Sequence, residues 1–453
     1  MYFKMPHLKI FIALTFIITL FSCNKSENEV ILDDSPVAEF TGEIDWAKNF
    51  GGSNEDDAVS MAITPDGGFA IAGFTLSTDG DINDKTTTDA DFWVLKLAAD
   101  GTKLWSKTYG GTNDDRATRI INTNDGGFAV SGFTRSTDGD VSVNNGFYDY
   151  WLIKLDASGN LQWEKTYGFE GNDQAQSVMQ TSDGGFFVTG FLDVSASGGQ
   201  GNDFTRETLH GVGEFWGVKT NALGEIQWRR FFGGTNNDRS YEVVEANDGG
   251  FLMIGNSESN DFDITNPKGS YDFWAVKISA IGDLLWAKNY GGSEIEIAYA
   301  MTKTTDGNYL IVGDTRSNDK DITNPKGNAD VWAIKINDSG TLIWQKTFGG
   351  SQFDTSRSIR EFSDGNLLIT GSSRSVDQDV SANYGLSDFW TIITDPNGNT
   401  LFKKNYGGSN LEFGNAGVIT LNGKIVMAGS SLSNDFDVSE NKGAKDALII
   451  KLK

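Results

Sequence analysis

The tryptophans of this chain recur at a fixed spacing, and this period constrains the fold more than any other feature of the sequence. All twelve fall into two series that advance mostly by 58 residues, with one step of 65 in each series and one of 59. The series are Trp46, Trp105, Trp163, Trp228, Trp286, Trp344 and Trp93, Trp151, Trp216, Trp274, Trp332, Trp390, with Phe402 and Leu448 continuing them in register. A fixed period of this kind indicates one structural unit repeated along the chain, here seven times.

Each unit holds four short apolar runs separated by turn signals. In the second copy, ATRIINT (117–123) and FAVSGFT (128–134) flank the tetrapeptide NDGG, a strong hairpin signal because Asn, Asp and Gly tolerate positive φ. DYWLIKLD (149–156) and NLQWEKTYG (160–168) are joined by ASG, a second tight hairpin. Four strands per unit without a helical period predict an all-β fold: a seven-bladed β-propeller of four-stranded antiparallel blades over residues 43–453.

The hairpin motifs carry a resemblance to known propellers. G-x-L-x-W, found in DASGNLQW and NDSGTLIW, resembles the blade motif of quinoprotein-type propellers over about residues 43–453. The fuller unit, W-x-K-x-[YF]-G-G with a D-G-G-[FY] turn, is similar to a repeat of secreted or lipid-anchored bacterial propellers. The resemblance implies that the Trp-x-Lys strand is outermost in its blade and that the strand after Gly-Gly is innermost. The adjacent cysteine pair of the quinone-dependent dehydrogenases is absent, which argues against a quinone cofactor.

The two ends of the repeat region are complementary. The region begins with one outer strand, EIDWAKNF (43–50), and ends with three strands in NAGVITLN, KIVMAGSS and DALIIKLK. We therefore expect the N-terminal strand to complete the C-terminal blade and leave no free sheet edge at the join. The recurring tryptophans are interpreted as packing between blades, because aromatic side chains bury large areas and every unit carries them.

The N-terminus predicts export and lipidation. Residues 1–22 combine two lysines with the apolar run Ile10–Phe21, the pattern of a secretory signal peptide. Leu20-Phe21-Ser22-Cys23 resembles the lipobox of bacterial lipoproteins, so the single cysteine, Cys23, is the expected lipidation site. Residues 23–42 read as a flexible tether. The expected location is the bacterial outer membrane. A net charge of −25 makes a nucleic-acid partner improbable.

One acidic residue follows each Gly-Gly turn. If the next strand is innermost, these seven carboxylates surround one mouth of the central channel and are candidates for a cation- or ligand-binding ring. The alternative, which we favour, is that each accepts backbone hydrogen bonds that hold its turn. The residues are Asp56, Asp115, Asp173, Asp238, Glu296, Asp354 and Glu412.

A second acidic series lies in the loop before the second tryptophan of most units. In RSTDGDVSVNNGFYDYW (135–151), counted with Asp138 as position 1, the acids occupy positions 1, 3 and 12. This spacing could place several oxygen ligands around calcium. The loop is not an EF-hand, and a self-bonded turn is favoured over a calcium site, with both interpretations open. The candidates are Asp138, Asp140, Asp149; Asp261, Asp263, Asp272; Asp319, Asp321, Asp330; Asp377, Asp379, Asp388; and Asp435, Asp437, Asp446, while the longer first loop has Asp79, Asp81, Asp91.

The third unit departs from this pattern. Its loop, LDVSASGGQGNDFTRETLHGVGEFW (192–216), is seven residues longer, rich in glycine and without the D-x-D pair. One exception in a symmetric ring is a place where a ligand preference could be encoded, although loops also tolerate drift and insertion. The candidate ligand-binding residues are Asp203, Arg206, Glu207 and His210.

Two functions remain open. The favoured one is a non-catalytic binding or scaffolding module on the envelope, with a glycan or an envelope protein as partner and calcium as a possible aid. The alternative is a glycoside hydrolase that uses two carboxylates. With 62 acidic residues, such a pair arises by chance, so no catalytic residue is nominated. The chain has two histidines, His7 in the signal and His210, which argues against a histidine-based triad or a zinc site.

Overall fold

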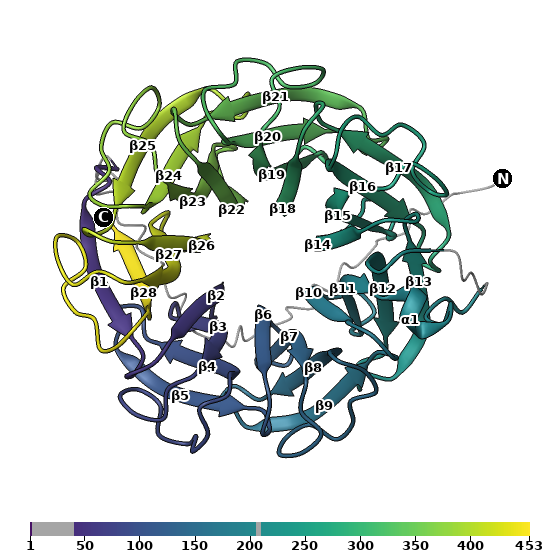
Figure 1. The fold of residues 1–453 in the computed structure, drawn as a ribbon, viewed down its shortest axis with the longest axis horizontal. Helices are drawn as coiled ribbons and strands as arrows, with labels where there is room; N and C mark the ends of the chain where they lie inside the picture. The colour runs from purple at the N-terminus through teal and green to yellow at the C-terminus, as the bar shows by residue number, and fades with distance from the viewer. Residues whose placement is uncertain (2–39, 205–209) are drawn as a thin grey trace. The chain divides into compact units, whose positions relative to one another are not determined.

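The computed structural model describes Met1 and residues 40–204 and 210–453, and its compact unit of residues 41–453 is a ring of seven four-stranded sheets (Figure 1). The sheets of the first three blades are β2 (Asp56–Ile63), β3 (Phe69–Thr75), β4 (Asp91–Leu97), β5 (Lys103–Tyr109); β6 (Asp115–Asn122), β7 (Phe128–Thr134), β8 (Asp149–Leu155), β9 (Leu161–Tyr167); and β10 (Gln174–Gln180), β11 (Phe186–Leu192), β12 (Glu214–Thr220), β13 (Ile226–Phe232).

The remaining blades continue the same order. They are β14 (Asp238–Glu245), β15 (Phe251–Ser257), β16 (Asp272–Ile278), β17 (Leu284–Tyr290); β18 (Glu296–Lys303), β19 (Tyr309–Thr315), β20 (Asp330–Ile336), β21 (Leu342–Phe348); β22 (Asp354–Glu361), β23 (Leu367–Ser373), β24 (Asp388–Thr394), β25 (Thr400–Tyr406); and β26 (Glu412–Ile419), β27 (Ile425–Ser431), β28 (Asp446–Leu452) with β1 (Ile44–Phe50). A short helix, α1 (Val194–Ser197), lies in the loop of the third blade.

Every blade is antiparallel and runs from the centre outwards. The first strand of each blade, such as β2 or β6, faces the central channel, and the strand with the Trp-x-Lys motif lies at the rim (Figure 1). The seven-bladed propeller predicted from the repeat is therefore confirmed. None of the helices among the described residues has the length and apolar character needed to cross a membrane.

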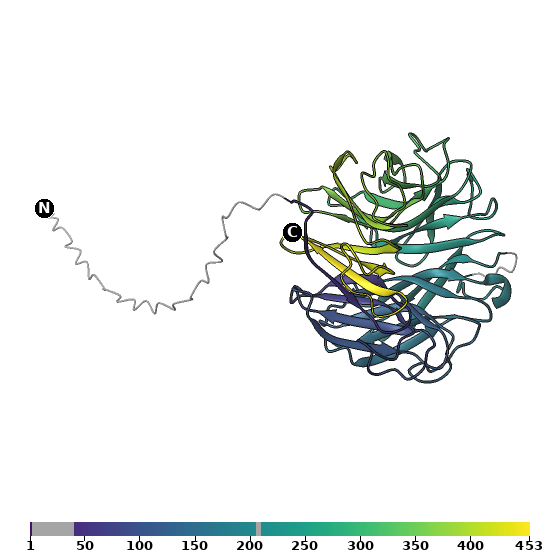
Figure 2. The same cartoon turned by 60° about the vertical axis from the view of Figure 1, so that its left-hand side comes forward.

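The first strand closes the ring. β1 pairs antiparallel with β28, with Trp46 opposite Lys451 and Phe50 opposite Ala447. The N–H of Lys453 donates to the carbonyl oxygen of Glu43 at 2.8 Å. Figure 2 shows the purple β1 beside the yellow strands of the last blade. The predicted closure is confirmed, and it covers the outer edge of β28, which would otherwise expose unpaired backbone groups.

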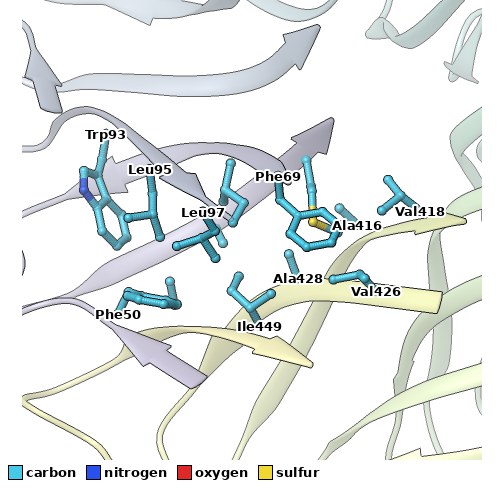
Figure 3. Packing of buried hydrophobic residues seen from close by; sticks show 14 of the residues in the cluster. Phe50, Phe69, Trp93, Leu95, Leu97, Ala416, Val418, Val426, Ala428 and Ile449 are labelled. Carbon is cyan, nitrogen blue, oxygen red and sulfur yellow. The ribbon is translucent and has the colours of Figure 1, made fainter. Parts of the chain in front are cut away.

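Apolar side chains from neighbouring blades interdigitate to form the core. Between the first and last blades, Phe69 and Trp93 pack with Val426 and Ile449 in one buried cluster (Figure 3). Strands from the middle of each blade are buried on both faces, so they read as continuous apolar runs. The core of the propeller therefore lies between blades rather than within one.

The outer aromatics lock each blade to the next. Trp105 lies against Gly159, whose φ of +73° requires glycine, and an added Cβ there would come within 2.8 Å of the indole. The hydroxyl of Tyr109 also donates to the carbonyl oxygen of Gly159 at 2.5 Å. The same contact recurs around the ring, and at the seam Phe402 lies against Gly42. The glycine and the aromatic of the blade motif thus serve packing between blades, as predicted for the tryptophans.

Candidate functional site

The seven acids after the Gly-Gly turns are buried and hydrogen-bonded. Each carboxylate accepts the N–H of the residue four positions earlier; Asp115, for example, accepts from Gly111 at 2.8 Å. Asp115 also accepts from the hydroxyl of Ser136 at 2.8 Å. All seven are fully buried, and none of them lines the central cavity. These contacts agree with the interpretation in which each acid holds its turn by accepting backbone hydrogen bonds.

The acids of the D-x-D loops have separate partners. Asp138 accepts from the N–H of Thr112 at 2.8 Å and from its hydroxyl at 2.9 Å. Asp140 accepts from the N–H of Gly110 at 3.2 Å, whereas Asp149 accepts from the N–H of Asn145 at 2.7 Å. Positions 1 and 3 therefore fasten the loop to the Gly-Gly turn, and position 12 holds the start of the next strand. Among residues 40–204 and 210–453, no group of three His, Cys, Asp or Glu side chains could hold a metal ion.

The third acid of each loop approaches the acids of the following blade. A Cβ added to Gly110 would lie 2.6 Å from Oδ1 of Asp91 and 2.8 Å from Oδ2 of Asp115, so both oxygens converge on this glycine. Oδ1 of Asp91 and its equivalents accept no hydrogen bond from any described residue. Burial is the largest cause that raises their pKa, to about 6 for Asp91, Asp149, Asp272, Asp330 and Asp446 and to about 7 for Asp388.

Lysines supply the positive charge at four of these blade junctions. Lys85 pairs with Asp91 at 2.9 Å, and both side chains are almost fully buried. Lys326 pairs with Asp379 at 2.7 Å and Lys442 with Asp81 at 2.5 Å, and Lys268 pairs with Asp321. At each of these four junctions an ammonium group therefore pairs with one of the loop carboxylates and balances its charge.

The described candidate residues in the long loop of the third blade form contacts within the protein. Asp203 pairs with Arg229 at 2.7 Å on the outer strand β13. His210 is buried, with Nδ1 3.3 Å from Oε2 of Glu214, and its ring packs 4.7 Å from that of Phe262. Burial raises the pKa of Glu214 to about 11. Arg206 and Glu207 lie outside the described residues. Of the described candidates, His210 lines a cavity of about 190 Å³ together with Arg230 and Asp263, whereas Asp203 does not.

The residues that line the central channel were not singled out in the sequence. In each inner strand the residue three positions after the acid is a β-bulge; in β6, Ala117 pairs with Gly132 and Arg119 with Ser131, which leaves Thr118 between them unpaired. These bulged residues surround a cavity of about 120 Å³ and are half-buried or exposed. They are Val59, Thr118, Gln176, Tyr241, Tyr299, Arg357 and Asn415.

A signal for these residues was present in the repeats. The acid that starts the strand is the same type in all seven copies, whereas three residues later the side chain differs in almost every copy. A position that varies within a symmetric ring cannot be required by the blade itself, so it is free to serve a ligand. Comparison of the repeats for their differences, rather than for their shared residues, would have found the channel.

Three arginines, Arg119, Arg357 and Arg360, line this cavity, and others lie on or near the inner strands. Of the eleven arginines in the chain, eight lie on the inner strands or directly follow a second strand: Arg116, Arg119, Arg135, Arg239, Arg316, Arg357, Arg360 and Arg374. The Arg357 guanidinium lies 4.3 Å from the ring centroid of Tyr299, and this ring lies 5.4 Å from that of Tyr241. In a chain of net charge −25, this is a local basic and aromatic surface.

An ion pair lies in the wall of the channel. Arg119 of β6 pairs with Glu242 of β14 at 2.8 Å, across the inner strand of the third blade. Glu242 also accepts from the hydroxyl of Ser177 at 2.6 Å. Burial and the nearby Arg119 lower the pKa of Arg360 to about 10. Arg119 and Arg360 also line a second cavity, of about 390 Å³, that continues along the channel.

Comparisons with known proteins identify no family. No protein-family model matches the chain. It is 22% identical over 226 residues to the regulatory protein FlaEY of Caulobacter vibrioides, over 48% of this chain and 23% of that protein, so the match spans about a quarter of the relative. The solved structures include BBS1N in complex with ARL6DN (TM-score 0.45, 7% identity, 90% of this chain and 96% of that one) and a puromycin hydrolase mutant (0.42, 11%, 87% and 52%). Scores below 0.5 carry no argument about function.

Proposed function

We propose that this protein is a non-catalytic binding module of the bacterial envelope whose ligand enters the central channel. The observation that carries the proposal is the cavity lined by the bulged residues, where Tyr241, Tyr299 and Arg357 stand on one side. Aromatic walls with a few convergent polar groups are the usual lining of a ligand pocket, and the volume of about 120 Å³ limits the bound group to a small one. The surrounding propeller is a rigid frame for it.

The carboxylates near the cavity favour binding over glycoside hydrolysis. Hydrolysis requires two carboxyl groups that face the substrate, one to donate a proton and one to attack or activate water. Here Glu242 is held by Arg119, and Asp57 pairs with Lys445 at 3.0 Å. Asp314 is buried and accepts from the hydroxyl of Thr355 at 2.9 Å. Among the described residues of the channel, these carboxylates are engaged in internal contacts, so the enzymatic alternative is the weaker one.

A glycan array probed with the full mature protein tests this proposal. We expect retention of one glycan class without turnover, in an amount that falls when Tyr299 is changed to Ala. The array should be run with and without millimolar calcium, because calcium that assists binding would appear as a difference between the two arrays. Release of shortened sugars from a retained polysaccharide would instead support the glycoside hydrolase, and retention that is indifferent to Tyr299→Ala would place the ligand elsewhere.

Lipid anchoring is the second part of the proposal and rests on the lipobox-like sequence. We expect the mature protein to begin at Cys23 and to fractionate with membranes through its acyl chains. The Cys23→Ser variant is expected to appear in the soluble fraction or to accumulate as an uncleaved precursor. Fractionation with mass spectrometry of the N-terminal peptide checks this; a Cys23→Ser variant that stays fully acylated at its N-terminus would contradict it.

A further inference from the structure

We infer that the channel cavity is specific for an acidic sugar, a hexuronate at the end of a glycan, with Arg357 as the residue that recognises the carboxylate. The inference rests on the proposed function and names its ligand class. It starts from the charge of Arg357. Arg116 and Arg119 pair with Asp114 and Glu242, but no described carboxylate forms an ion pair with Arg357.

The surroundings of Arg357 favour an anion. It is the most exposed of the seven bulged residues, and its guanidinium lies over the face of Tyr299. This contact fixes the plane of the guanidinium and leaves its N–H groups available, and a guanidinium fork binds a carboxylate through two parallel hydrogen bonds. The channel walls add Arg239 and Arg316 near the two tyrosines. The three guanidinium groups make this part of the channel more basic than the rest of the protein, and the carboxylates of Asp57 and Asp314 also interact with Arg357.

The rest of the lining suits a polyhydroxylated ring. Thr118, Gln176 and Asn415 present hydroxyl and amide groups around the cavity, each able to donate and to accept. The rings of Tyr241 and Tyr299, which are tilted by 59° to each other, offer an apolar wall with polar tips. A pyranose has hydroxyl groups at its rim and C–H bonds on its faces, so it can use both kinds of contact. Its carboxylate would then meet Arg357.

The shape of the channel argues against a peptide and for a terminal sugar. Peptides bind sheets by adding a strand to a free edge, but the bulge in every inner strand interrupts the edge that faces the channel. Arg119 and Glu242, which pair with each other, both line the cavity of about 120 Å³. A cavity of this volume has room for an end group rather than for a glycan chain that passes through it, so the group that reaches Arg357 is a terminal sugar.

Titration of the full mature protein with D-glucuronate, D-galacturonate and D-glucose tests the inference. By calorimetry or ligand-observed NMR, we expect at least one uronate to bind and D-glucose to bind at least tenfold more weakly. Arg357→Met keeps the alkyl stem over Tyr299 but removes the charge, so it should weaken the uronate at least tenfold and abolish the preference over glucose. The matched control is Lys303→Met, an exposed cation at the opposite end of an inner strand, which should leave the affinity unchanged.

Each outcome separates this inference from the broader proposal. Equal binding of uronate and glucose, no uronate binding, or an unchanged affinity in Arg357→Met would overturn the acidic-sugar assignment. A glutamate-rich peptide that binds in an Arg357-dependent manner, with no uronate binding, would replace it by a peptide site. In each of these cases a ligand retained on the array in a Tyr299-dependent manner would leave the binding-module proposal standing. The melting temperature of Arg357→Met, expected to match the parent, excludes unfolding as the cause of lost binding.

Discussion

Deletion of residues 43–50 is expected to lower the free energy of unfolding by at least ~3–5 kcal/mol, the scale of a truncated core aromatic. The deletion removes β1, and with it the packing of Trp46 against Phe69, whose ring centroids are 6.3 Å apart. It also exposes the backbone edge of β28, which other chains could then pair with. Thermal melting and size-exclusion chromatography should therefore show a lower melting temperature and self-association.

An added peptide and a control variant test whether the loss of β1 itself causes this destabilisation. A synthetic peptide of residues 41–52, added in excess, should restore the melting temperature, because it can pair with β28 in the place of β1. Leu421→Ala, in a loop of the same blade where the side chain is 92% exposed, should change the stability by less than about 0.5 kcal/mol. A deletion variant that melts like the parent would disprove the role of β1 in closing the ring.

Raising the pH from 5.5 to 8 is expected to destabilise the propeller by several kcal/mol. Burial raises the pKa of six junction aspartates, among them Asp388 to about 7, above the ordinary value of 3.8. Between these values the folded state binds more protons than the unfolded state, so stability falls as the pH rises through about 6 to 7. A shift of two units corresponds to ~3 kcal/mol for one group. Urea unfolding at both pH values, with chelator present, measures the change.

The Asp388→Asn variant tests whether this aspartate contributes to the loss of stability at alkaline pH. Asparagine keeps an oxygen that can accept the N–H of Tyr384, at 2.7 Å in the parent, but it does not ionise. The stability of the variant relative to the parent should therefore increase by ~1–3 kcal/mol between pH 5.5 and pH 8. At the exposed Asp156, where the N–H of Asn160 lowers the pKa, the same substitution should act in the opposite direction at pH 8. An Asp388→Asn variant that is equally destabilised by alkaline pH would exclude this aspartate as a source of the effect.

Aspartates with a lowered pKa act in the opposite direction and set the lower limit of the pH range in which the propeller is most stable. Asp66, Asp125 and Asp183 have a pKa lowered to about 2, and each lies beside a lysine and a threonine hydroxyl. Their contribution is present above the ordinary pKa of aspartate and is lost as the pH falls toward 2. The parent protein should therefore be most stable near pH 4, where neither group of aspartates destabilises it strongly.

The sequence alone determined the number of blades, the four strands of each and the closure by the first strand. It could do so because strand pairing within a blade joins residues that are near in the chain, such as Phe128 and Leu155, and because turn signals mark every hairpin. The period of the tryptophans did the rest, since a repeated unit with an incomplete first and last copy can be completed in one way.

Only the tertiary structure decided what meets across the blades and in the channel. Asp91 faces Asp115, and Arg119 pairs with Glu242 more than a hundred residues away, because the closed ring brings successive blades together at a fixed angle. The bulge in each inner strand turns Tyr299 and Arg357 into the channel. Neither the angle between blades nor the position of a bulge is encoded in a local pattern of apolar and polar residues; both follow from the packing of side chains between neighbouring sheets.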